Sequence, residues 1–194
     1  MDALAMPFHA IGKSAKLLVS STAALAVLCS DSWTPLYYIT GALCNALMSK
    51  AIKRVVRQPR PAASKKGGYG MPSSHAYLLF YFFTVAALLS RKHYPSYVST
   101  LLSLGMGGYA VTASSWRVAD GLHSAAQTMA GASLGLGTGF LVFAKEQQTL
   151  SALMSAFPQA TKVPPAVKAV VLISGGVALW YKEMNAMRKK RLDT

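Results

Sequence analysis

The sequence predicts an all-α fold, a multi-pass transmembrane bundle of about six helices. Three observations support this prediction. The 194-residue chain is 53% hydrophobic, only 13% of its residues are charged, and its mean hydropathy is +0.33. A soluble domain usually carries about 25% charged residues. The length fits one compact unit, so we expect residues 1–194 to form a single membrane domain.

The charge balance indicates what kind of partner the protein has. Twenty Lys and Arg residues stand against six Asp and Glu, which gives a formal net charge of +14. Such charge on an apolar chain argues against a soluble nucleic-acid-binding protein, whose basic face lies on an ordinary globular surface. We therefore expect a membrane protein that binds anions. We expect it to have no nucleic-acid partner. The sequence carries no signal for a particular oligomeric state.

Six apolar stretches mark the expected helices, over residues 16–30, 35–49, 75–90, 97–115, 122–143 and 165–181. The fourth and fifth exceed the roughly 17 residues that a spanning helix needs, and the other four are marginal alone but plausible within a packed bundle. The first could instead be a signal peptide, since lysines precede it and small residues near Ser30 permit cleavage. We expect an uncleaved helix, because the second stretch follows closely and can pack against it.

The fifth stretch carries glycines four residues apart, Gly131, Gly135 and Gly139. At this spacing they share one helix face and let a second helix approach closely. We expect that second helix to belong to the same chain, although small residues are also common in membrane helices generally.

Three polar segments carry the residues suited to chemistry. They are "KRVVRQPRP" with Lys53 and Arg60, "PSSH" ending at His75, and "WRVADGLHSAAQ" with Arg117, His123 and Gln127. If six helices cross a membrane, residues 50–74 and 116–122 lie on the same face, because two helices separate them. The three segments can therefore converge at one site.

Their chemistry is that of a phosphate site. Cationic side chains near apolar helix ends are costly unless an anion lies among them. Arg60 and Arg117 can bind phosphate bidentately, and Lys53 supplies a point charge. Ser73 or Ser74 can cap the helix that follows, whose free N–H groups also favour an anion.

Two histidines flank this site, so one can attack phosphorus while the other protonates the leaving oxygen. His123 and Gln127 lie four residues apart on one helix face. The amide oxygen of Gln127 can accept from Nδ1–H and so present Nε2, the orienting role of a carboxylate in a catalytic triad. The cationic side chains can neutralise the developing charge, and no carboxylate cluster is present to hold a metal. We expect neither a metal nor another cofactor.

The pattern K-x6-R-P, then P-S-x-H, then R-x5-H-x3-(D/Q) resembles the type 2 phosphatidic acid phosphatase (PAP2) superfamily. That superfamily includes lipid phosphate phosphatases, bacterial undecaprenyl-diphosphate phosphatases and vanadium haloperoxidases. The motifs span residues 53–127, and the six-segment layout covers nearly the whole chain. The resemblance implies a PAP2-like helical core.

The resemblance also implies a role for each motif residue. His123 is the expected nucleophile, which forms a phosphohistidine that water later hydrolyses, and His75 is the expected general acid. The residues expected to bind the phosphate are Lys53, Arg60, Ser73, Ser74 and Arg117.

Three positions depart from the family pattern. Ser74 stands where the family usually has Gly, and Gln127 stands where it usually has Asp. Trp116 replaces the Ser that usually precedes the arginine of the third motif, with Ser115 one position earlier. Ser74 and Gln127 resemble the dolichyl-diphosphatase and plant lipid phosphate phosphatase branch.

These features predict an integral-membrane enzyme that removes a terminal phosphate from a lipid phosphate or diphosphate. The branch resemblance favours a polyprenyl (dolichyl-type) diphosphate as substrate. The runner-up is phosphatidate, lysophosphatidate or a sphingoid phosphate. The alternative of another class is a catalytically dead membrane scaffold that binds lipid phosphates. Haloperoxidase chemistry is less favoured, because that relative is soluble and needs vanadate.

The expected location is the endoplasmic reticulum or the plastid envelope. Six spans place both termini on the catalytic face, together with the basic loop and the "RKKR" tail. The positive-inside rule then puts catalysis on the cytosolic or stromal side. A dolichyl-type role would instead imply a lumenal site, so the two lines of inference disagree about the face.

Overall fold

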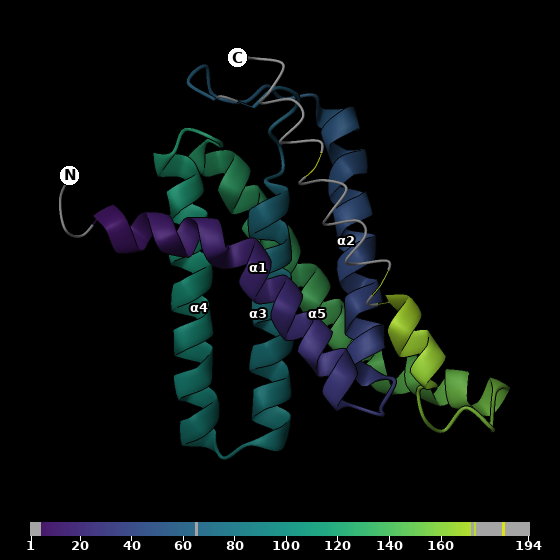
Figure 1. The fold of residues 1–194 in the computed structure, drawn as a ribbon. Helices are drawn as coiled ribbons and strands as arrows, with labels where there is room; N and C mark the ends of the chain where they lie inside the picture. Colours follow the sequence, from purple (N-terminus) through teal and green to yellow (C-terminus); the bar gives the residue numbers. More distant parts are fainter. Residues whose placement is uncertain (1–4, 65, 172, 174–183, 185–194) are drawn as a thin grey trace.

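The computed structural model describes residues 5–64, 66–171, 173 and 184, and its fold is an all-α bundle (Figure 1). The helices are α1 (Ala5–Cys29), α2 (Thr34–Val56), α3 (Ser74–His93), α4 (Ser96–Ala119) and α5 (Ala125–Ala156). Residues 165–171 begin a further helical segment. An isolated antiparallel bridge joins Pro59 to Tyr69 in the loop after α2.

These helices confirm the first five predicted stretches and extend most of them. α1 begins well before the predicted start at residue 16. α5 continues to Ala156 through "AKEQQTLSALMSA", which is rich in good helix formers. Of the sixth stretch, predicted over 165–181, residues 165–171 are helical, whereas 172 and 174–181 lie outside the described residues. Within the described ranges, no helix combines the length and sustained apolar character that a membrane span requires.

The central contact of the bundle joins α3 to α5 along the predicted glycine face. A side-chain carbon at Gly131 would overlap the carbonyl oxygen of Ser73, and one at Gly135 would overlap that of Tyr77. At Gly139 it would overlap Thr84. The glycines therefore let the two helices pack backbone to backbone within one chain, as predicted.

α1 crosses α3 and α4 diagonally (Figure 1). Ala15 of α1 is buried against Leu79, Ala110 and Ala113. One turn earlier, α1 passes so close to the Trp116 ring that any side chain at Gly12 would overlap it. Small residues thus seat α1 over the groove between α3 and α4.

The ends of the helices bring the polar segments together. α2 ends, α3 begins, α4 ends and α5 begins at the same end of the bundle, where the 57–73 loop also lies (Figure 1). The convergence predicted for residues 50–74 and 116–122 is therefore present.

Candidate active site

A cavity of about 430 Å³ opens at this end of the bundle. We call it the cationic cavity, because the described residues that line it include four positively charged side chains and no acidic one. Its polar lining consists of Ser20, Lys53, Arg60, Lys66, Ser74, His75, Arg117 and His123. Four cations around one hollow repel one another, so the cavity is suited to a multiply charged anion.

The first polar segment is shaped by the end of α2. Arg57 adopts a left-handed conformation (φ 50°) that ends the helix. The loop then folds back, with the Gly70 N–H donating to the Gln58 carbonyl over 2.8 Å. Lys53 Nζ donates to the carbonyls of Tyr69 and Gly70, each at 3.3 Å. Lys53 is therefore held at the cavity wall by the part of the loop that folds back, at Tyr69 and Gly70.

The second segment forms the start of α3. Ser73 occupies the N-cap position, but its side chain makes no capping hydrogen bond. Its hydroxyl is buried, lacks a partner among the described residues and does not line the cavity. The predicted contact between the Ser73 side chain and phosphate has no support in this arrangement. Ser74 does line the cavity, where its hydroxyl shares a 2.7 Å hydrogen bond with Ser49.

The third segment is a tight turn between α4 and α5. The N–H groups of Leu122 and His123 both donate to the Arg117 carbonyl, at 3.0 and 3.2 Å. Gly121 at the corner has φ +66°, which favours glycine. This turn brings the imidazole of His123 back beside the arginine that precedes it by six positions.

The hydrogen bonds of His123 define one tautomer. Arg60 Nη1 lies 3.0 Å from Nε2, and an arginine can only donate, so Nε2 is the acceptor. Nδ1 then carries the proton and donates to Gln127 Oε1 at 3.3 Å. The ring is buried and presents its Nε2 lone pair on the side of the cations. This is the geometry that a nitrogen nucleophile needs.

The electrostatic surroundings keep this ring neutral. Burial lowers the pKa of His123 to about 4, and the neighbouring Arg60 guanidinium adds to the effect. Lys53 and Arg117 contribute further in the same direction, and the Gln127 hydrogen bond opposes them only in part. His123 therefore holds an unprotonated Nε2 at neutral pH.

Gln127 ties the three segments together. Its Nε2 donates to the Pro59 carbonyl at 2.8 Å and to Gln58 Oε1 at 3.3 Å. Its Oε1 also accepts from the Ser124 N–H, which completes a capping box at the start of α5. The carbonyl of Gln127 accepts from the Ser73 N–H at 2.9 Å. An amide is suited to this position because it donates on one side and accepts on the other.

His75 is oriented by an arginine. Arg117 Nη2 lies 3.3 Å from His75 Nδ1, so Nδ1 is the acceptor and the proton of a neutral ring lies on Nε2. His75 becomes a general acid when Arg117 releases Nδ1 and that nitrogen binds a second proton, because the imidazolium can then give up its Nε2 proton.

Trp116, the departure with no rationale in the sequence, supports Arg117. The tryptophan is buried, and the Arg117 guanidinium lies 5.0 Å from its ring centroid. A cation at this distance is attracted to the face of the ring. The same ring receives α1 at Gly12. Trp116 thus links α1 to an arginine of the cavity.

Five of the residues that the sequence predicted to converge line the cavity, namely Lys53, Arg60, His75, Arg117 and His123. Sequence reasoning missed Lys66, which lies outside the three motifs and also lines the cavity. It also missed Gln58 and Ser49, whose contacts with Gln127 and Ser74 depend on how the loop folds. The signal in the sequence for the folded-back path of this loop is the set of glycines at 67, 68 and 70, which permit close approach of the backbone.

The described residues contain no group of three or more His, Cys, Asp or Glu side chains arranged to hold a metal ion.

Comparison with known proteins gives consistent results. The PAP2 superfamily model matches residues 34–150. Two Arabidopsis thaliana proteins are similar: lipid phosphate phosphatase epsilon 2, chloroplastic (30% identity, 62% of this chain) and epsilon 1, chloroplastic (31%, 64%). The matched regions cover 42% and 45% of those relatives, less than half of their length.

A solved structure shares the fold. It is the transmembrane PAP2-type phosphatidylglycerolphosphate phosphatase from Bacillus subtilis, with a TM-score of 0.66 and 22% identity. The match covers 76% of this chain and 79% of the other.

Proposed function

The chain belongs to the PAP2 superfamily, and on that premise we propose that it is a membrane phosphatase that hydrolyses the terminal phosphate of a lipid phosphate or diphosphate. The phosphate binds in the cationic cavity among Lys53, Arg60 and Arg117, with Ser74 at the helix start and Lys66 at the rim. Arginine forks match phosphate oxygens, and the N-terminus of α3 adds its partial positive charge.

The reaction proceeds in two displacements. His123 Nε2 attacks phosphorus, a P–N bond forms, and the bond from phosphorus to the lipid oxygen breaks. His75 is then an imidazolium, because Arg117 turns from its Nδ1 to the phosphate and Nδ1 takes up a proton from solvent. It gives its Nε2 proton to that departing oxygen and is left neutral. Water then attacks the phosphohistidine with His75 as base, which releases inorganic phosphate and restores the neutral imidazole of His123. The cations stabilise the charge that develops on the phosphoryl oxygens, so the proposed reaction needs no metal.

One observation carries the proposal. His123 is held with Nδ1–H on Gln127 and with Nε2 as an acceptor facing the cations. In the structure the Arg60 guanidinium occupies that lone pair. A phosphate oxygen is a stronger acceptor for Arg60 than a neutral imidazole is. Substrate binding would therefore draw Arg60 onto the phosphate and free Nε2 for attack.

Two substrate classes have support. The Ser74 and Gln127 variants favour a polyprenyl diphosphate, through their resemblance to the dolichyl-diphosphatase branch. The names of the similar Arabidopsis proteins favour a lipid phosphate in general, and the name of the Bacillus subtilis phosphatase adds a glycerolipid phosphate as a candidate.

The outer surface of the bundle supports a location within a membrane. Large apolar side chains are exposed on α1, α2, α4 and α5, among them Leu17, Leu25, Leu43, Leu47, Leu101, Leu104, Phe140 and Leu141. Soluble monomers rarely expose so much contiguous apolar surface. The chloroplastic relatives favour the plastid envelope over the endoplasmic reticulum.

The test is phosphate release by detergent-solubilised protein from polyprenyl diphosphate, phosphatidate and lysophosphatidate, with and without a chelator. We expect release from at least one lipid, unchanged by the chelator and abolished by His123→Ala. A folded protein that binds these lipids without hydrolysing any of them would establish the scaffold alternative instead.

A further inference from the structure

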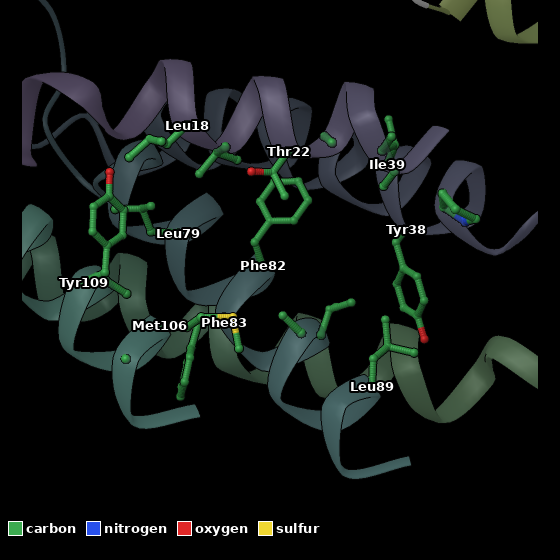
Figure 2. A pocket seen from close by; sticks show the side chains of 18 of the residues that line it. Leu18, Thr22, Tyr38, Ile39, Leu79, Phe82, Phe83, Leu89, Met106 and Tyr109 are labelled. Atoms are coloured by element: carbon green, nitrogen blue, oxygen red, sulfur yellow. The ribbon is translucent and has the colours of Figure 1, made fainter. Parts of the chain in front are cut away.

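A second, apolar cavity of about 470 Å³ lies beneath α1. α1, α2, α3 and α4 all contribute to its walls, and Figure 2 shows side chains that line it. Leu18, Phe82, Phe83 and Met106 are among the apolar residues, and none of the described residues that line it is charged. We call it the apolar groove. A hollow of this kind accepts hydrocarbon and excludes ions.

The apolar groove and the cationic cavity adjoin one another. Val19 of α1 and Leu79 of α3 line both. One hollow is therefore cationic and the adjoining one is hydrocarbon-like, with a two-residue boundary between them. This is the polarity profile of a molecule with a phosphate at one end and an apolar chain at the other.

The length of the apolar groove matches one leaflet of a bilayer. Along α3 it extends from Leu79 to Leu89. Ten residues of α-helix rise about 15 Å. The hydrocarbon core of a bilayer is about 30 Å thick, so this length corresponds to about half of it.

One hydroxyl at the boundary has no partner among the described residues. Tyr109 of α4 packs beside Val19 and Leu79, and Figure 2 shows its hydroxyl near Leu18. That hydroxyl is buried and makes no hydrogen bond with any described residue. A buried hydroxyl without a partner costs free energy, which a ligand with an acceptor at this position would recover.

We propose that the apolar groove binds one hydrocarbon chain of the substrate, and that Tyr109 donates to a neutral oxygen between that chain and the phosphate. This inference rests on the proposed function. A glycerolipid or sphingoid phosphate carries such an ester or hydroxyl oxygen. A polyprenyl diphosphate carries only a charged second phosphate there, which the apolar walls disfavour. The substrate class is thus a phosphate ester with a neutral polar linker.

The first test fills the apolar groove. Gly105 of α4 lines it, and a side-chain carbon there would meet nothing within 4 Å. Gly105→Leu should lower kcat/KM for hexadecyl phosphate at least about tenfold, because the chain loses apolar burial, and should leave butyl phosphate unchanged. Gly108→Leu is the matched control, since Gly108 has the same open surroundings on the same helix and lies outside the groove. Equal effects of the two variants on hexadecyl phosphate would overturn the inference.

The second test removes the hydroxyl. Tyr109→Phe should lower kcat/KM for lysophosphatidate about three- to tenfold, the value of one neutral hydrogen bond. It should leave hexadecyl phosphate unchanged, because that lipid has no acceptor between chain and phosphate. An equal loss for both lipids, or a loss for neither, would contradict the role of Tyr109.

These tests distinguish a failure of the proposed chain binding from a failure of the proposed hydrolysis. Butyl phosphate reports hydrolysis alone, so its turnover tests the proposed function independently of chain binding. If butyl phosphate is hydrolysed with the same kcat/KM as hexadecyl phosphate, the phosphatase proposal stands and the proposed binding of a chain in the apolar groove is wrong.

Discussion

At the scale of single residues, the orientation of His123 determines what the site can do. The motif spacing predicted that Gln127 would face His123, and the structure places Oε1 of the amide on Nδ1. The spacing could not show that the same amide also reaches Pro59 and Gln58, because those contacts depend on the folded path of the 57–70 loop. Sequence therefore identified the pair but not its connection to the loop.

Gln127→Glu tests the need for an amide. The carboxylate keeps an acceptor for Nδ1 but loses both donor contacts and places an oxygen against the Pro59 carbonyl. We expect kcat to fall about tenfold or more, as for other groups that orient an active-site ligand. Steady-state kinetics beside Gln127→Leu as a control would show this. Activity equal to or above that of the parent would mean that the donor side of the amide is dispensable.

His75→Ala tests the general acid. We expect about 10²- to 10⁴-fold slower hydrolysis of a lipid phosphate, whose alkoxide leaving group needs a proton. Hydrolysis of p-nitrophenyl phosphate should fall far less, because nitrophenolate leaves without protonation. Comparing the two substrates on one preparation gives the answer. Equal losses on both would place His75 in binding instead of proton transfer.

The neutral state of His123 also makes stability depend on pH. Its pKa is about 4 in the folded protein against an ordinary 6.5. Between these values the unfolded chain binds a proton at this position and the folded protein does not, so stability falls as pH decreases from 6.5 towards 4. His123→Gln should flatten this slope by about one proton. Thermal unfolding in detergent micelles between pH 4.5 and 7.5 measures how stability depends on pH. If stability depends on pH in the same way in both proteins, the lowered pKa of His123 is ruled out.

At the scale of helices, the α3–α5 contact positions the site. Ser73 and His75 at the start of α3 and His123 just before α5 belong to different segments, and the glycine face sets their separation. Sequence predicted this contact from the four-residue glycine spacing. It also predicted the helices themselves, because apolar stretches identify them. It did not predict their full lengths, since α5 continues through polar residues with good helix propensity and α1 begins at Ala5, ahead of the predicted stretch.

Gly135→Ala tests the close packing of these helices. Its new methyl group would overlap the Tyr77 carbonyl, and overpacking of this kind costs about 1–3 kcal/mol. Gly137→Ala, on the same helix with nothing within 4 Å, should instead leave stability unchanged or raise it by about 0.5–1 kcal/mol. Thermal unfolding of both variants gives the comparison. A Gly135→Ala protein as stable as Gly137→Ala would show that the contact is looser than described.

At the scale of the whole molecule, the proposed lipid site consists of two adjoining hollows, the cationic cavity and the apolar groove. Sequence indicated the first, because its cations fall in three recognisable motifs. It could not indicate the second, whose residues come from four helices and resemble ordinary core positions one by one. Tyr109 illustrates the point, since only the arrangement of α1 over α3 and α4 leaves its hydroxyl buried beside the boundary.

In the proposed reaction, His123 carries the phosphoryl group between the two displacements. The most direct measurement is rapid acid-free quenching of the protein with ³²P-labelled lysophosphatidate, followed by peptide mapping of the label. We predict an alkali-stable, acid-labile label on the peptide that contains His123, absent from His123→Ala and accumulating if His75→Ala slows the hydrolysis step. Turnover with no label at His123, or the same label in His123→Ala, would contradict the account.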